Sequence, residues 1–196
     1  MKDGGIFSIG HSTQPLDRFI ALLKQQQIDV VADVRSSPFS RYNPQFNRES
    51  ISEALRSAGI KYAFFGKELG ARADDPSCYV NGKVQYSRLA SRKEFKEAVE
   101  RLLKGAIDYR IALMCAEKEP LDCHRTILVS QELSKGGTEV QHIHHDGSLE
   151  THTAALERLL DITGVPTTDL FKSKEELLCE ALERQESRIA YQESGA

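Results

Sequence analysis

Short apolar runs alternate along the chain with longer segments in which apolar residues recur every three or four positions. The runs are typical of buried strands, and the recurrent spacing is typical of helices that turn one face to a core. This pattern predicts strands at residues 6–9, 28–34, 61–65, 110–114 and 140–143, and helices at 16–23, 51–58, 91–103, 126–133, 153–160 and 173–189. Strands that alternate with helices favour right-handed crossovers and a mostly parallel sheet.

The predicted fold is therefore α/β, a single domain with a mostly parallel five-stranded sheet and helices on both faces, of the Rossmann-like or flavodoxin-like kind. The length of 196 residues supports one domain. A chain of this size buries enough apolar surface to fold without a disulfide or a metal. We expect the α/β domain to span residues 1–165, and residues 166–196 to form a C-terminal helical appendage whose last residues, 193–196, fray.

Residue types at the predicted helix ends indicate where several helices begin and end. Asn47 is a candidate cap for the second helix, and Gly59 is its expected stop. The spacing of a capping box occurs twice, at Ser91 with Glu94 and at Ser173 with Glu176. Each pair predicts the first turn of a helix.

The charge is unevenly distributed along the chain. The formal net charge is −3, but residues 35–110 carry fifteen basic and nine acidic side chains, whereas residues 111–196 carry eight basic and sixteen acidic ones. The total argues against broad coating of nucleic acid, while the basic middle of the chain is a candidate anion-binding surface. The alternative is a set of scattered solvated helix faces.

Membrane and export signals are missing from the hydropathy pattern. The residues before the first apolar run, 6–9, do not make a signal peptide. No apolar run approaches the ~18 residues that a membrane-spanning helix needs. We therefore expect a cytoplasmic protein with no membrane partner, in which the cysteines stay reduced; they are Cys78, Cys115, Cys123 and Cys179.

Reactive side chains gather where three predicted strands end. His11 follows the first strand, and Asp33 and Arg35 close the second. Cys115 and Glu117 follow the fourth strand. Ligands of open α/β sheets bind outside the carboxyl ends of the strands. We therefore predict one pocket at this edge of the sheet.

The densest chemistry follows the fourth predicted strand. Cys123 precedes a helix, where the helix dipole and Arg125 favour a thiolate. His124 can pair with either thiol, and Arg125 with backbone N–H groups can hold a phosphate or carboxylate. Cys115 closes a buried strand, where a cysteine is commonly a small apolar residue. The identity of the reactive thiol stays open.

Zinc is an alternative at the same residues. The two cysteines and His124 offer three donors, which His11, or His142 and His144, would supplement. The separation of the two cysteines is not a usual zinc spacing, and an adjacent Cys-His pair is awkward as joint ligands. We therefore predict no resident cofactor, with a metal as the alternative. The other interpretation of His142, His144 and His145 is a polar strand end that runs into a turn.

Aromatic and arginine residues interleave in the loop after the second strand, at residues 35–48. Aromatic rings such as Tyr42 can stack on bases while guanidinium groups such as Arg41 hold phosphates, as in single-strand binding proteins. The alternative is a loop whose aromatics anchor it in the core while its arginines face water. The long irregular segment at 66–88 would bring Arg72 to the same anionic pocket if it folds over the loop.

Three stretches of the chain carry a family resemblance. They are 9–12, Ile-Gly-His-Ser; 33–35, Asp-Val-Arg, with the Ser-Pro and Arg-Tyr-Asn-Pro-Gln-Phe-Asn that follow; and 115–117 through 123–125, Cys-Ala-Glu to Cys-His-Arg. Together they resemble the DUF488 family of bacterial and archaeal proteins of unknown function, over residues 6–145. The resemblance implies a shared site without supplying a chemistry. In that family Leu-Gly-Gly is expected before the loop arginine, whereas here Ala71 stands between Gly70 and Arg72, and a position that needs a positive φ resists alanine.

The leading hypothesis is an enzyme that uses a thiol-containing pocket on a small anionic substrate, nucleotide-like or phosphorylated. The predicted catalytic residues are Cys115, Cys123, His11, His124, Asp33 and Glu117. The predicted anion-binding residues are Arg35, Arg41, Tyr42, Arg72 and Arg125. The alternatives are a module that binds nucleic-acid ends without catalysis and a metal-dependent hydrolase. The sequence predicts no oligomeric state.

Overall fold

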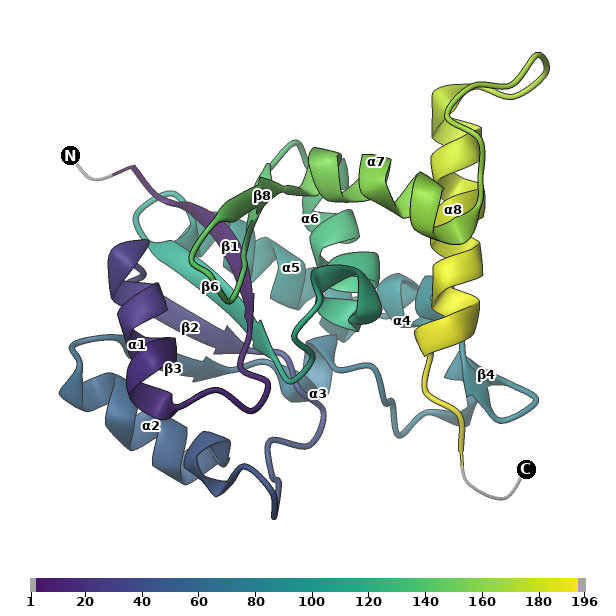
Figure 1. The fold of residues 1–196 in the computed structure, drawn as a ribbon. Coiled ribbons are helices and arrows are strands. Elements are labelled where there is room, and N and C mark those ends of the chain that lie inside the picture. Colours follow the sequence, from purple (N-terminus) through teal and green to yellow (C-terminus); the bar gives the residue numbers. More distant parts are fainter. Residues whose placement is uncertain (1–2, 194–196) are drawn as a thin grey trace.

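The computed structural model describes residues 3–193, and its centre is a six-stranded sheet (Figure 1). Its strands are β1 (Gly5–Gly10), β2 (Val30–Asp33), β3 (Lys61–Phe64), β6 (Arg110–Cys115), β7 (Val140–Ile143) and β8 (Leu149–Thr151). They lie in the order β3-β2-β6-β1-β7-β8, and every pairing is parallel except that of β7 with β8. The α/β class and the mostly parallel sheet are confirmed. The prediction of five strands missed β8, which has three residues and a single apolar side chain.

Eight α-helices accompany the sheet within the described residues. They are α1 (Leu16–Gln25), α2 (Arg48–Ser57), α3 (Gly66–Leu69), α4 (Tyr86–Ser91), α5 (Lys93–Gly105), α6 (Gln131–Lys135), α7 (His152–Thr163) and α8 (Lys174–Ile189). A π-helical segment, Arg125–Ser130, runs directly into α6. None of these helices has both the length and the apolar character that crossing a membrane requires.

The two faces of the sheet are covered by different helices, with α1 and α2 on one side and α5 and α6 on the other (Figure 1). The alternation of side chains along each strand explains this division. In β6, Ala112 and Met114 pack with α1 and α2, whereas Ile111, Leu113 and Cys115 pack into the larger core on the opposite face. Cys115 therefore ends the strand on the side of the larger core.

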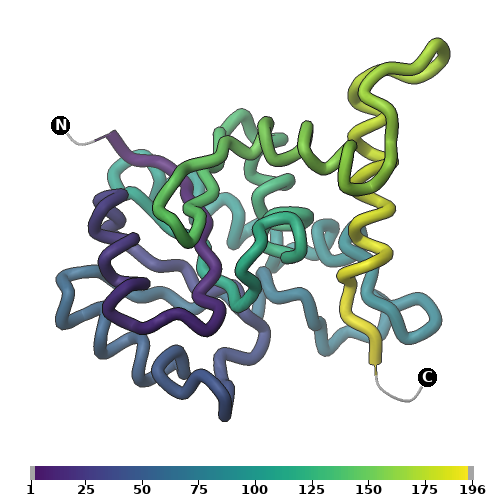
Figure 2. The backbone as a smooth tube through the Cα atoms, in the orientation of Figure 1, coloured from purple at the N-terminus to yellow at the C-terminus, as the bar shows by residue number. Residues whose placement is uncertain are grey.

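The segment 66–88, predicted as one irregular loop, is built from short elements. It contains α3, a hairpin of β4 (Tyr79–Val80) and β5 (Lys83–Val84), and the start of α4. The hairpin lies beside the residues that directly follow α8 (Figure 2), where the backbone N–H of Val84 donates to the carbonyl of Tyr191. The segment 66–88 and the residues at the end of α8 therefore pack together on one side of the molecule.

Two of the predicted helix starts have different outcomes. The capping box of α8 is confirmed, since Ser173 Oγ accepts from the backbone N–H of Glu176 and the Glu176 carboxylate accepts from that of Ser173. The capping box at Ser91 is wrong, because Ser91 ends α4 and its hydroxyl donates to the carbonyl of Arg88. The cap of α5 is Arg92, which has no side-chain cap bond. The spacing of a capping box is present here because Ser91 lies at the end of one helix and Glu94 lies in the first turn of the next.

The other predicted helix signals concern α2 and the chain end. Asn47 is the cap residue of α2, but its side-chain oxygen accepts from the backbone N–H of Ser40. Gly59 follows the helix with φ of 79°, as expected for a stop. Of the residues predicted to fray, only Glu193 lies among the described residues, and its backbone N–H donates to the carbonyl of Gly82.

A chain of buried polar side chains crosses the interior between β1, β7 and α7. Ser8 Oγ lies 2.7 Å from His142 Nδ1, His142 Nε2 lies 3.2 Å from His152 Nδ1, and His152 Nε2 lies 3.1 Å from Gln131 Oε1. These contacts form a single donor-to-acceptor series when both imidazoles are neutral. The strand β7 ends at Ile143 and a turn follows at Gly147, as the interpretation of these histidines as a strand end predicts, and His142 itself is fully buried.

Acidification is expected to destabilise the protein through this histidine pair. Burial lowers the pKa of His152 to about 4, and burial with His152 and Arg125 lowers the pKa of His142 well below its ordinary value. The unfolded chain therefore binds more protons, so stability falls as the pH drops from ~6.5 toward ~4. The His152 share amounts to about 3 kcal/mol at the acidic end. Urea unfolding between pH 7 and 4.5 should show this slope, and His152→Gln should reduce it; an equal slope in the variant contradicts the prediction.

Candidate functional site

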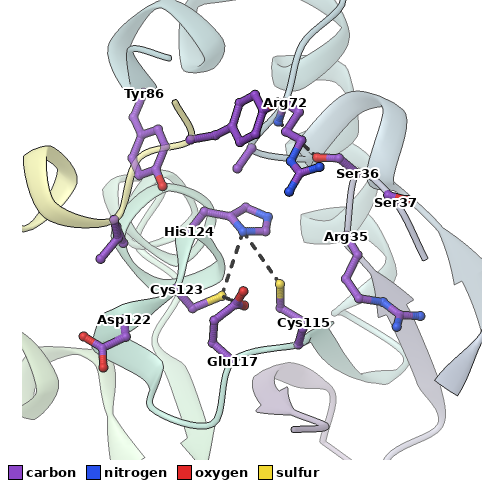
Figure 3. Close-up of a pocket in the computed structure, with 14 residues that line it drawn as sticks. Arg35, Ser36, Ser37, Arg72, Tyr86, Cys115, Glu117, Asp122, Cys123 and His124 are labelled. Atoms are coloured by element: carbon purple, nitrogen blue, oxygen red, sulfur yellow. Dashed lines mark hydrogen bonds between the residues drawn. The ribbon is translucent and has the colours of Figure 1, made fainter. Parts of the chain in front are cut away.

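The carboxyl ends of three adjacent strands meet at one edge of the sheet. Because β6 lies between β2 and β1, the residues that follow these strands come together there. A cavity of about 240 Å³ opens at this edge (Figure 3). Its lining residues are Arg35, Ser36, Ser37, Ala71, Arg72, Tyr86, Cys115, Ala116, Glu117, Asp122, Cys123, His124, Ile189 and Tyr191.

Two free thiols and one imidazole form the floor of this cavity. His124 Nδ1 lies 3.7 Å from Cys115 Sγ and 3.9 Å from Cys123 Sγ. The other ring nitrogen, Nε2, lies 3.1 Å from the carbonyl oxygen of Val34, to which it donates. This bond fixes the tautomer, so Nδ1 presents a lone pair to the thiols.

Cys123 has further polar contacts, some of which favour its thiolate. Its Sγ lies 2.9 Å from Glu117 Oε2 and accepts from the backbone N–H of Arg125 at 3.4 Å. Burial opposes ionisation, but the hydrogen bond with Cys115 and the charges of Arg125 and His124 hold the pKa of Cys123 well below its usual value. The hydrogen bond with Cys123, together with burial, raises the pKa of Cys115 well above its usual value.

Glu117 and His124 complete this proton-sharing set. Burial of the Glu117 carboxyl group and the neighbouring Cys123 raise its pKa, although the residue as a whole is exposed. Burial acts to lower the pKa of His124, yet Cys123 and Glu117 outweigh it and raise that pKa. The arrangement thus supports one thiolate at Cys123, with the proton held by His124 or Glu117.

The loop between β6 and the π-helical segment owes its shape to contacts from several elements. A short 3-10 turn, Pro120–Asp122, is capped by Glu119, whose carboxylate accepts from the backbone N–H of Leu121. Gln185 of α8 is fully buried, and its amide donates to the Leu121 carbonyl at 2.9 Å and to the Asp122 carboxylate at 3.1 Å. Sequence reasoning missed Gln185, because a polar residue on an amphipathic helix gives no signal of a contact 64 positions away.

Gly10 allows the end of β1 to pack closely against this loop. A Cβ at Gly10 would overlap the carbonyl oxygen of Glu117. Gly10→Ala is therefore expected to destabilise the protein by at least about 2 kcal/mol, since backbone must move. Gly5→Ala in the same strand is the control, because the nearest atom lies 3.6 Å from its Cβ. Urea unfolding of both variants checks this, and equal stabilities would contradict it.

Arg35 belongs to a second network beside the thiols. Its Nε and one terminal nitrogen donate to the two carboxylate oxygens of Asp33 at 2.9 and 2.7 Å, and the latter nitrogen also donates to the Phe46 carbonyl. The other terminal nitrogen lies 3.0 Å from His11 Nε2. Burial, assisted by Arg35, lowers the pKa of His11 to about 4. His11 is therefore a neutral acceptor for Arg35, and it lines the cavity next to the thiol cavity rather than the thiol cavity itself.

The remaining predicted binding residues lie in three different places. Arg72 lines the thiol cavity, its backbone N–H donates to Ser36 Oγ at 3.0 Å, and its guanidinium stacks on Tyr191. Arg125 is fully buried, and its guanidinium donates to the carbonyls of Glu117 and Lys118, so it braces the loop rather than facing the cavity.

Arg41 and Tyr42 are exposed in the loop after β2 and do not line the thiol cavity. A neighbouring cavity of about 250 Å³ lies under the same loop, next to Phe39. It shares Arg35, Ser37 and Ala116 with the thiol cavity, so the two spaces adjoin. A nucleic-acid role for this loop stays a prediction.

The cavity also contains residues that sequence reasoning did not select. Tyr86 of α4 (Figure 3) and Tyr191 after α8 both line it. Burial raises the pKa of Tyr86, so its hydroxyl stays protonated. Both residues reach the cavity through long-range packing, which no local motif reveals.

The thiol cluster has the composition of a metal site. The ligand atoms of Cys115, Cys123 and His124 all lie within 4.8 Å of one another, so these residues can hold a metal ion. The argument that adjacent Cys123 and His124 are awkward joint ligands fails, since both side chains reach the same point. His11 and His142 are engaged elsewhere.

A family model matches more than half of the chain. The family model described as domain of unknown function DUF488 matches residues 15–131, which contain β2, β6 and the thiol loop. No curated protein and no solved structure matches the chain. Gln185 and Tyr191 lie outside the matched residues.

Proposed function

Because the chain belongs to the DUF488 family, whose function is unknown, we propose its activity from the site alone: it is a cysteine-dependent enzyme that acts on a small anionic substrate. The observation that carries this proposal is the placement of His124. Its Nε2 is bonded to the Val34 carbonyl, and its Nδ1 faces both thiols at the floor of an open cavity. A nucleophile with its base in reach, and the base oriented by a third group, is the general pattern of covalent catalysis.

Cys123 is the nucleophile in this proposal, and His124 carries its proton. The thiol proton of Cys123 passes to His124 Nδ1, and the thiolate sulfur then bonds to the electrophilic atom of the substrate. The leaving group departs with the proton from His124. Water activated by the neutral imidazole then releases the product and restores the thiol.

Cys115 stabilises the charged form of the nucleophile, and Glu117 lies beside it. Cys115 remains a thiol and donates to the Cys123 sulfur, and the backbone N–H of Arg125 supplies a second donor. The Glu117 carboxyl group lies 2.9 Å from the Cys123 sulfur and shares the proton that leaves it. Asp33 has an indirect role: its ion pair fixes the position of Arg35, and Arg35 lines the cavity.

Arg72 provides the positive charge for the substrate. The guanidinium of Arg35 is already neutralised by Asp33, and that of Arg125 is fully buried. Arg72 is exposed, and its guanidinium is directed into the cavity (Figure 3). A cavity of about 240 Å³ suits a phosphorylated or carboxylated small molecule.

The four cysteines allow a test within one molecule. Iodoacetamide treatment at pH 7, followed by mass spectrometry of each cysteine, should alkylate Cys123 at least about tenfold faster than exposed Cys179, because an ordinary thiol is only a few per cent ionised there. Buried Cys78 should react slowest. Equal and slow reaction of Cys123 and Cys179 contradicts the proposal.

The charge of the reagent tests the anionic substrate. Iodoacetate, which is negatively charged, should react with Cys123 relatively faster than with Cys179 when both rates are divided by those for iodoacetamide. Arg72→Gln should remove this preference. If Cys123 of Arg72→Gln keeps its preference for iodoacetate, a group other than Arg72 attracts the anion.

A further inference from the structure

Three donors at the floor of the cavity match the spacing of a zinc tetrahedron. Zinc bound at about 2.3 Å to sulfur and about 2.0 Å to nitrogen separates its ligand atoms by roughly 3.5–3.8 Å. His124 Nδ1 lies 3.7 and 3.9 Å from the sulfurs of Cys115 and Cys123. All three ligand atoms fall within 4.8 Å of one another, so closure onto an ion needs only small side-chain movements.

The groups around these donors are those that support a metal site. A zinc-binding histidine commonly donates its second ring N–H to a backbone carbonyl, as His124 does to Val34. The backbone N–H of Arg125 donates to the Cys123 sulfur, which favours a metal-bound thiolate. Two thiolates and an imidazole favour zinc over magnesium or calcium, which prefer oxygen ligands.

The fourth ligand and the charge balance are also present. Glu117 Oε2 lies 2.9 Å from Cys123 Sγ and can reach an ion held by that sulfur. Two thiolates, one carboxylate and Zn²⁺ leave a single negative charge. The fully buried guanidinium of Arg125 offsets this charge, since its hydrogen bonds in the described structure go only to backbone carbonyls.

We propose that Cys115, Cys123, His124 and Glu117 bind one zinc ion, and that this ion reversibly blocks the enzyme. The blocking role rests on the proposed function of Cys123 as the nucleophile. On binding, the Cys115 thiol proton and the proton shared by Cys123, His124 and Glu117 pass to solvent, and each sulfur donates a lone pair to the metal. The ion then withdraws electron density from the Cys123 sulfur and so lowers its nucleophilicity, and His124 Nδ1, which donates its lone pair to the ion, accepts no proton until a stronger chelator removes the ion.

The test uses the full chain, stripped of metal by a chelator under reducing conditions, and Zn²⁺ alone as the probe. Competition with a chromophoric zinc indicator should give one ion per chain. One equivalent of Zn²⁺ should slow iodoacetamide alkylation of Cys123 at least about 20-fold, while alkylation of exposed Cys179 stays unchanged. Because this protection is measured on the natural sequence, no variant has to fold.

Variants and a second metal identify the ligands. Cys115→Ala should weaken zinc binding at least about 100-fold, whereas Cys179→Ser should bind zinc as the natural chain does. Co²⁺ should give thiolate charge-transfer absorption in Cys179→Ser and lose most of it in Cys115→Ala. Equal Co²⁺ spectra in the two variants would overturn the site.

The outcomes separate this inference from the proposed function. A fast Cys123 that one equivalent of Zn²⁺ protects supports both. A fast Cys123 in the metal-free chain that Zn²⁺ does not protect overturns the zinc inference and leaves the thiol enzyme. A slow Cys123 in a chain that binds one zinc overturns the thiol enzyme and the blocking role together, and favours the metal-dependent hydrolase.

Discussion

The His124→Gln variant is expected to alkylate at Cys123 about 100-fold more slowly than the natural chain at pH 7. Glutamine keeps an N–H that can reach the Val34 carbonyl, so the loop retains its anchor, but it offers no base at the position of Nδ1. Without the imidazolium, Cys123 lies buried beside Glu117, and both features disfavour its thiolate. Rates of alkylation for each cysteine, measured by mass spectrometry, check this result.

The dependence of this rate on pH adds a second readout. In the natural chain the rate at Cys123 should be nearly constant between pH 6 and 8, whereas in His124→Gln it should rise about tenfold per unit, as for an un-ionised thiol. His144→Gln is the matched control, because His144 contacts Glu150 and lies outside the thiol cavity. A His124→Gln rate within twofold of the natural one would remove His124 from the mechanism.

The strand ends that build the site are readable from the sequence because they are local. The apolar runs before His11, Asp33 and Cys115 predict buried parallel strands, and parallel strands bring their carboxyl ends to one edge. The direction in which a loop side chain points, in contrast, is not determined by the neighbouring sequence. Arg125 was expected to hold an anion, yet it turns inward to brace the carbonyls of Glu117 and Lys118.

The wall of the cavity opposite the thiols depends on packing between distant segments. Tyr191 reaches it because the end of α8 pairs with the β4–β5 hairpin, and Gln185 reaches the thiol loop from the same helix. The amphipathic pattern of α8 predicts a buried face but not its partner. Length also limits prediction, since β8 has too few residues to show a period.

Asp33 is the most heavily bonded carboxylate of the site network. It is fully buried and accepts from the backbone N–H and two side-chain nitrogens of Arg35, and from the hydroxyl of Tyr62 at 2.8 Å. Burial and Asp33 raise the pKa of Tyr62, so its hydroxyl stays a donor. Removing the carboxylate would leave the buried Arg35 guanidinium with the backbone carbonyl of Phe46 and the His11 imidazole as its partners in the described structure.

Asp33→Ala should therefore cost about 3–5 kcal/mol of unfolding free energy, the range for one broken partner of a buried pair. The double variant Asp33→Leu with Arg35→Met should lose less, because it removes both charges and fills their volume. Glu53→Ala is the exposed control. It breaks the pair with Arg56, whose side chains are 75–80% exposed, and should stay within about 0.5 kcal/mol of the natural chain. Urea unfolding at pH 7 ranks the three variants, and a loss below about 1 kcal/mol for Asp33→Ala would mean that water reaches Arg35 and the cavity wall is not held by this pair.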